Sequence, residues 1–133
     1  MRSGLVFTSA NHAWQRGQVP EGVDDGILTA YEIVNLDLRN TELVVLSACD
    51  TGLGDIESTE GVFGLQRAFK QAGVDKIIMS LWKIPDKETL EFMETFYGYF
   101  LNGKSIREAF VQTQREISNK FDPYYWAGFV LVE

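Results

Sequence analysis

The only cysteine of the chain, Cys49, ends a continuous apolar stretch and opens a short segment that contains Gly52 and Gly54. A cysteine thiolate is a strong nucleophile, and open α/β sheets bind their ligands beyond the carboxyl ends of their strands. The backbone N–H of Cys49 could then face a substrate oxyanion. The alternative is a small buried hydrophobic residue, which is the commoner role of a lone cysteine. Asp50 favours that alternative, because a neighbouring carboxylate raises the pKa of a thiol.

A second loop that could carry chemistry runs from Trp82 to Asp86, after the next apolar stretch. If the two stretches are adjacent parallel strands, both loops lie at the same edge of the sheet. The structural alternatives are that Trp82 belongs to the core or the sheet edge and that Asp86 is the N-cap of the next helix. The only histidine, His12, lies in a loop-like segment and is most simply a surface residue.

We expect no cofactor and no metal. The chain has no His/Cys cluster with the spacing of a metal site. Its Gly52-Leu53-Gly54 segment lacks the third glycine and the immediate helix of a dinucleotide-binding loop.

The elements that would position these residues alternate between strands and helices. Continuous β-branched stretches without alternation are typical of strands buried on both faces. The Thr29-x-x-Glu32 and Ser105-x-x-Glu108 patterns each predict a capping box at the start of a helix, and Gly73 predicts a helix end. We expect strands at 5–7, 43–48, 76–82 and 126–132, helices at 29–35, 60–72, 86–103 and 105–117, and a loop at 11–26.

This order predicts an α/β fold with a mainly parallel sheet of about three to four strands flanked by helices. On the last helix, one face carries Ile106, Ala109, Phe110, Thr113 and Ile117. Three of these strands, at 43–48, 76–82 and 126–132, have a clear apolar pattern. A sheet of three strands is small for this fold class, so we expect further strands outside this sequence.

Composition and charge exclude several classes of protein. The 133 residues fit one domain, and 45% hydrophobic residues allow a sizeable core. A net charge of -7 argues against a nucleic-acid partner, which needs a basic face. One cysteine allows no internal disulfide and suits a reducing compartment. There is no signal peptide pattern and no apolar run near the about 20 residues of a membrane span, so we expect no membrane partner and a cytoplasmic protein.

Several motifs, spread over nearly the whole chain, resemble the CHAT domain family, a branch of the caspase–separase clan of cysteine peptidases. The cysteine segment and the Ser-Leu-Trp segment are the two that carry candidate site residues. The matching stretches are VVLSACDTGLG at 44–54, EGVFGLQRAF at 60–69, SLWKIPD at 80–86 and PYYWAGFV at 123–130.

The resemblance implies a caspase-like α/β sandwich and a Cys–His dyad in which Cys49 attacks a peptide carbonyl. It also implies that the 80–83 segment lies along the substrate cleft, with Ser80 and Trp82 as substrate-binding residues. In relatives, acidic residues near the cleft select a basic residue before the cleaved bond. Asp50 and Asp86 are the candidates for this role here.

The family's histidine lies in a His-Gly motif upstream of the stretches that match. His12 is followed by Ala13 and not by glycine, so the dyad role is not assigned to it. We therefore expect residues 1–133 to be the C-terminal portion of a CHAT domain, without its N-terminal strands and His motif, and inactive alone as a cysteine endopeptidase. The alternative is a non-catalytic pseudo-protease that binds partners through an exposed sheet edge. Its expected partners are a protein or peptide substrate, and a segment or second chain that completes the sheet.

Overall fold

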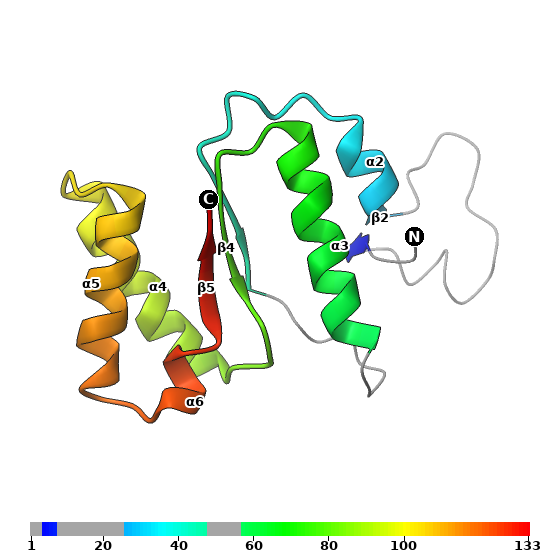
Figure 1. The fold of residues 1–133 in the computed structure, drawn as a ribbon. Helices are drawn as coiled ribbons and strands as arrows, with labels where there is room; N and C mark the ends of the chain where they lie inside the picture. The colour runs from blue at the N-terminus through cyan, green and yellow to red at the C-terminus, as the bar shows by residue number, and fades with distance from the viewer. Residues whose placement is uncertain (1–3, 8–25, 48–56) are drawn as a thin grey trace. The chain divides into compact units, whose positions relative to one another are not determined.

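The computed structural model describes residues 4–7, 26–47 and 57–133, and the chain divides into two compact units (Figure 1). Unit 1 comprises Met1–Glu42 and Asp55–Asp75, and unit 2 comprises Leu43–Gly54 and Lys76–Glu133. Unit 2 contains three of the predicted substrate-binding residues: Ser80, Trp82 and Asp86.

Unit 1 contains two short strands and two helices. Strand β1 (Gly4–Val6) pairs antiparallel with β2 (Ile27–Thr29), and Gly4 lies opposite Thr29. Helix α2 (Ala30–Val34) begins with the predicted capping box between Thr29 and Glu32, and it contacts α3 (Glu57–Ala72). Strand β2 was not predicted, because only three residues separate Gly26 from the helix that Thr29 caps.

The end of α3 follows the predicted glycine signal. Gly73 has a φ of 108°, and its N–H donates to the Lys70 carbonyl while that of Val74 donates to the Phe69 carbonyl. These two bonds form a Schellman motif. A Cβ at Gly73 would lie 2.7–2.9 Å from atoms of Arg39, so both the backbone conformation and the space require glycine. The apolar face of α3 is buried at Leu65, Ala68, Phe69 and Ala72.

Unit 2 contains a three-stranded sheet in the order β3 (Leu43–Leu46), β4 (Lys76–Ser80) and β5 (Phe129–Val132). Strands β3 and β4 are adjacent and parallel, with Leu46 beside Met79. Strand β5 runs antiparallel to β4, with Ser80 opposite Phe129. The α/β class is confirmed. The sheet is mixed because the chain returns through Tyr124, which contacts Trp82 at the carboxyl end of β4, and β5 therefore starts at that end.

Helices α4 (Asp86–Leu101) and α5 (Ile106–Ser118) cover one face of this sheet (Figure 1). The Ser105–Glu108 capping box is confirmed at the start of α5. Phe92 of α4 is fully buried and stacks on Phe129 of β5, with ring centroids 4.2 Å apart. The predicted inner face of α5 is confirmed, since five residues are buried there: Ile106, Ala109, Phe110, Thr113 and Ile117.

A short helix, α6 (Pro123–Trp126), precedes β5 where a strand was predicted from residue 126. Asp122 occupies its N-cap position and Pro123 its first helical position, where the fixed φ of proline suits a helix start. Strand β5 begins only at Phe129. Over the described ranges 4–7, 26–47 and 57–133, the chain forms no helix with the length and apolar character that crossing a membrane requires.

Candidate functional site

The parallel pairing of β3 and β4 determines which segments leave the sheet at the same edge. Leu46, the last residue of β3, lies beside Met79, and Ser80 ends β4 one residue later. Cys49 and Asp50 follow Leu46 by three and four residues in the sequence, and both lie outside the described residues. His12 also lies outside them. Strands β3 and β4 therefore end at one sheet edge, and the position of Cys49 relative to the loop after β4 stays a prediction.

Ser80 ends β4 in a buried position. Only 2% of its surface is exposed, and its backbone lies opposite that of Phe129 in β5. The next residue, Leu81, donates its N–H to the Gly128 carbonyl at 2.8 Å. The start of this loop is thus fixed to the segment that leads into β5.

Trp82 is 37% exposed and is held by α6. Its indole Nε1–H donates to the Tyr124 carbonyl at 2.8 Å. In return, the Tyr124 hydroxyl donates to the Lys83 carbonyl at 3.2 Å. The two rings stack with centroids 6.1 Å apart and planes inclined by 27°. Trp82 is therefore neither a core residue nor a mobile surface side chain, but a surface ring with a defined orientation.

Gly128 provides the space that the indole occupies. A Cβ on Gly128 would lie 2.8 Å from Cε2 and 3.0 Å from Nε1 of Trp82. It would also lie 3.1 Å from the Cδ1 atom of Ile84. Carbon atoms do not approach carbon at 2.8 Å without repulsion, so any side chain at residue 128 would displace the indole. The glycine is required by close approach and not by a special backbone angle.

The prediction that Asp86 is an N-cap is wrong. Pro85 occupies the N-cap position, with an extended backbone (φ -55°, ψ 148°), and Asp86 is the first residue of α4. The first helical hydrogen bond runs from the N–H of Thr89 to the Pro85 carbonyl at 3.0 Å. A side chain inside the first turn cannot cap it as an N-cap residue does. Asp86 is exposed, and its carboxylate makes no hydrogen bond or ion pair with any residue that the structure describes.

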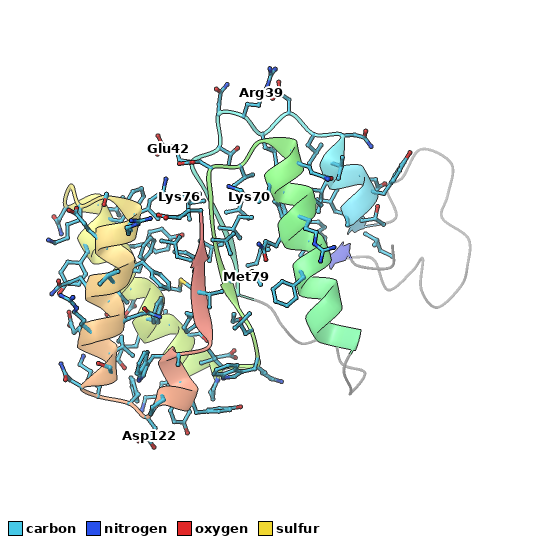
Figure 2. All side chains as sticks on the ribbon, in the orientation of Figure 1. Arg39, Glu42, Lys70, Lys76, Met79 and Asp122 are labelled. Atoms are coloured by element: carbon cyan, nitrogen blue, oxygen red, sulfur yellow. The ribbon has the colours of Figure 1, made fainter. Side chains whose placement is uncertain are left out.

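Asp122 lies at the same end of unit 2 as α6, as Figure 2 shows. It occupies the N-cap position of that helix but makes no side-chain capping hydrogen bond. Within the described ranges, no group of three or more His, Cys, Asp or Glu residues has the arrangement of a metal site.

Two pairs of polar side chains with shifted pKa values join α4 to α5 and to the turn that follows α5. The pKa of Tyr99 is raised because its hydroxyl donates to the Glu116 carboxylate at 2.5 Å, and burial raises it further. The pKa of Lys120 is raised by its hydrogen bond to Glu91, at 2.9 Å. Tyr99 follows Asp86 by 13 residues in α4, about 20 Å along the helix. These groups therefore stabilise the α4–α5 pair and do not belong to the candidate site.

Two residues of this site, Tyr124 and Gly128, were not identified from the sequence as site residues. Both lie in the PYYWAGFV stretch, which was used only as a family motif. The Asp122-Pro123 pair could have indicated a helix start. No sequence signal could have indicated that the helix would bring Tyr124 to Trp82, since 42 residues separate them.

Comparison with known proteins gives one family and two curated relatives. The family model described as "CHAT domain" matches residues 1–133. Tetratricopeptide repeat protein 28 of Mus musculus is 35% identical over 112 residues. Tetratricopeptide repeat protein 28 of Homo sapiens is 33% identical over 109 residues. Each match covers 80% of this chain and 4% of the relative, so the chain spans about 4% of the length of the curated relatives it matches.

Proposed function

The chain belongs to the CHAT domain family, and from that membership we propose that it is the C-terminal half of a caspase-like cysteine endopeptidase with Cys49 as its nucleophile. The observation that carries this proposal is the parallel pairing of β3 and β4. This pairing supports the proposal, because strands β3 and β4 end at the same sheet edge, where α/β enzymes bind substrates.

The proposed reaction needs a base that this sequence does not supply in the family's position. The Cys49 thiolate would attack the peptide carbonyl, the C–N bond would break, and the amine would leave with a proton from a histidine. Water would then hydrolyse the thioester. A cysteine without a base is mostly protonated at neutral pH, given an ordinary pKa of about 8.5. We therefore propose that a His-Gly segment completes the dyad and that the 133 residues alone are inactive.

The substrate class proposed for this site is a peptide with a basic residue before the cleaved bond. Asp86 supports this, because its exposed carboxylate is free of other described partners. Asp50 is the second acidic candidate. The exposed Trp82 would contact the peptide, whereas Ser80, predicted as a substrate-binding residue, is buried and would act only by ending the strand that positions Trp82. A single thiol functions best in a reducing environment, so we place the protein in the cytoplasm.

The test compares the rate at which iodoacetamide alkylates Cys49 between pH 5 and 9 in two proteins. One is the 133-residue chain, and the other is the longest natural form of the protein that includes a His-Gly segment. We expect an ordinary thiol pKa in the first and a lowered one in the second, because a neighbouring imidazolium stabilises the thiolate. Cys49→Ser gives the background, and the histidine exchanged for alanine in the longer form should restore the ordinary pKa. Equal, unperturbed reactivity in both forms would contradict a dyad.

A second candidate function is that of a pseudo-protease that binds partners without cleaving them. The observation that favours it is the outer edge of β3, which pairs with no strand within the described residues. Such an edge accepts a strand from another segment or a second copy of the chain. Sedimentation velocity of the 133-residue chain decides the self-association part: concentration-dependent dimers support it, and a stable monomer at every concentration argues against it.

A further inference from the structure

The loop after β4 is held from the opposite end of unit 2's sequence. Three hydrogen bonds tie it to the segment that surrounds α6: Leu81 N–H to the Gly128 carbonyl, Trp82 Nε1–H to the Tyr124 carbonyl, and the Tyr124 hydroxyl to the Lys83 carbonyl. Tyr124 therefore takes part in two of the three, once as an acceptor through its backbone and once as a donor through its side chain.

The ring of Tyr124 also lies against the ring of Trp82. Their planes are inclined by 27° with centroids 6.1 Å apart, and both rings keep a large exposed area, 37% for Trp82 and 56% for Tyr124. Tyr125 supports Tyr124 from the side, edge to face at 5.4 Å. Gly128 contacts the indole as well, because the absence of a side chain there lets the Trp82 ring pack directly against the backbone. The orientation of Trp82 is thus set by α6 and Gly128, not by its own loop.

We infer that Tyr124 and Gly128 are positioning residues for substrate binding, acting through Trp82. This inference rests on the proposed function, in which Trp82 lies along the peptide cleft. Tyr124 fixes the plane of the indole through the ring contact and fixes the Lys83 carbonyl through its hydroxyl. Because the Trp82 indole is already oriented before the peptide binds, binding does not incur the conformational entropy loss of ordering a mobile side chain. The consequence is tighter peptide binding, with no direct contribution to the chemistry at Cys49.

The test uses Tyr124→Phe, Tyr124→Ala and Gly128→Ala in the longest natural form of the protein that includes a His-Gly segment. The probe is the fluorogenic peptide that this form cleaves fastest in a mixed library. We expect Tyr124→Phe to raise KM about fivefold, the effect of one neutral hydrogen bond, and to leave kcat within about twofold. Tyr124→Ala should raise KM further, because the ring contact is lost as well.

Tyr125→Phe is the matched control, since the same hydroxyl is removed one residue away and the Tyr125 hydroxyl has no hydrogen-bond partner among the described residues. It should leave KM and kcat unchanged. The indole N–H of Trp82 gives a readout that needs no activity: in 1H–15N spectra of the 133-residue chain, its exchange with solvent should quicken in Tyr124→Ala and Gly128→Ala. Trp82→Phe assigns that signal.

The outcomes separate the two proposals. If the longer form cleaves no peptide, the proposed function fails. If it cleaves and Tyr124→Phe changes KM no more than Tyr125→Phe does, the positioning role is overturned and the proposed function stands. A fall in kcat with KM unchanged also overturns it, because the role assigned to Tyr124 is in binding. Gly128→Ala is interpreted only where thermal unfolding shows that the variant is folded, and Tyr124→Phe decides the question otherwise.

Discussion

The two long helices of unit 2 begin in different ways. Helix α5 starts with a complete capping box, in which Ser105 accepts from the Glu108 N–H and the Glu108 carboxylate accepts from the Ser105 N–H. Helix α4 starts after Pro85 with no side-chain capping bond, and its first residue is the exposed Asp86. Both helices pack on the same core, so the difference is confined to their first turns.

This difference separates a carboxylate that caps its own helix, in α5, from one that has no structural role and can bind a ligand, in α4. The Glu108 carboxylate of α5 is hydrogen-bonded to its own helix start, whereas the carboxylate of Asp86, the first residue of α4, is exposed and has no described partner. A helix N-terminus stabilises a nearby negative charge, so a carboxylate in the first turn is favourable there without a capping role. An anion held in this way can serve a cationic ligand.

The largest expected effect concerns what holds α4 in the absence of a cap. Phe92→Ala should lower the free energy of unfolding by about 3–5 kcal/mol, because it leaves a cavity in a fully buried site. The Phe92 ring stacks on Phe129 and meets Phe110 edge to face at 5.8 Å, so two contacts are lost at once. Urea unfolding followed by circular dichroism measures it. Leu90→Ala, on the same helix but 60% exposed, is the control and should stay within about 0.5 kcal/mol.

A smaller effect is expected at the start of α5. Ser105→Ala removes the acceptor for the Glu108 N–H, at 3.2 Å, and should cost about 1 kcal/mol. Asp86→Ala in α4 is the matched change, and we expect it to cost less than half as much, because no capping bond is lost. The same urea measurements compare the two. Equal losses would mean that Asp86 caps α4 in solution, and the contrast between the helices would disappear.

Local signals in the sequence predicted most of the fold. Both capping boxes, the Gly73 stop, the buried face of α5 and the α/β class are confirmed. The adjacent parallel pairing of the two apolar stretches was a condition of the sequence argument, and the structure meets it. The N-cap of α4 was misplaced by one residue, because Pro85, whose extended backbone precedes the first helical residue, takes that position instead of Asp86. The direction of β5 depends on where α6 returns the chain, which no local pattern encodes.

The candidate site was predicted in part. The sequence indicated Ser80, Trp82 and Asp86 through the family motif, and their association with Cys49 at the nucleophile loop stays a prediction. Tyr124 and Gly128 were missed as site residues, because their role follows from a contact across 42 residues and from the shape of one indole. Periodicity and capping patterns predict contacts between residues close in sequence. The contact between Trp82 and Tyr124 joins residues far apart in sequence, so these patterns do not predict it.

The capping box of α5 should also make the stability of the chain depend on pH. The pKa of Glu108 is lowered chiefly by the hydrogen bond from the Ser105 N–H, then by the Ser105 hydroxyl and by the charge of Lys104. A carboxyl with a lowered pKa stabilises the folded state above its ordinary value of about 4.3, and this contribution is lost as the pH falls through the folded pKa. The stability advantage of the natural chain over Glu108→Gln should therefore be present at pH 7 and be smaller at pH 3, below the ordinary pKa of a glutamate. Urea midpoints at the two pH values measure it, and an equal gap at both would contradict the assigned cause.

The smallest expected effect on stability, and the sharpest test of the contrast between the helices, is Asp86→Asn. Asparagine keeps the shape of the side chain and removes its charge, so we expect unfolding to change by less than about 0.5 kcal/mol, the size of an exposed charge at a helix N-terminus. Binding of a basic peptide to the longest natural form should weaken about twofold to fivefold, the range of an exposed ion pair.

Glu94→Gln is the control, because Glu94 lies on the same helix, is exposed and has no partner among the described residues. Isothermal titration at low and high salt measures the peptide affinity, and the difference between the natural protein and Asp86→Asn should shrink at high salt. A large loss of stability with unchanged affinity would return Asp86 to a structural role, and the start of α4 would then resemble that of α5.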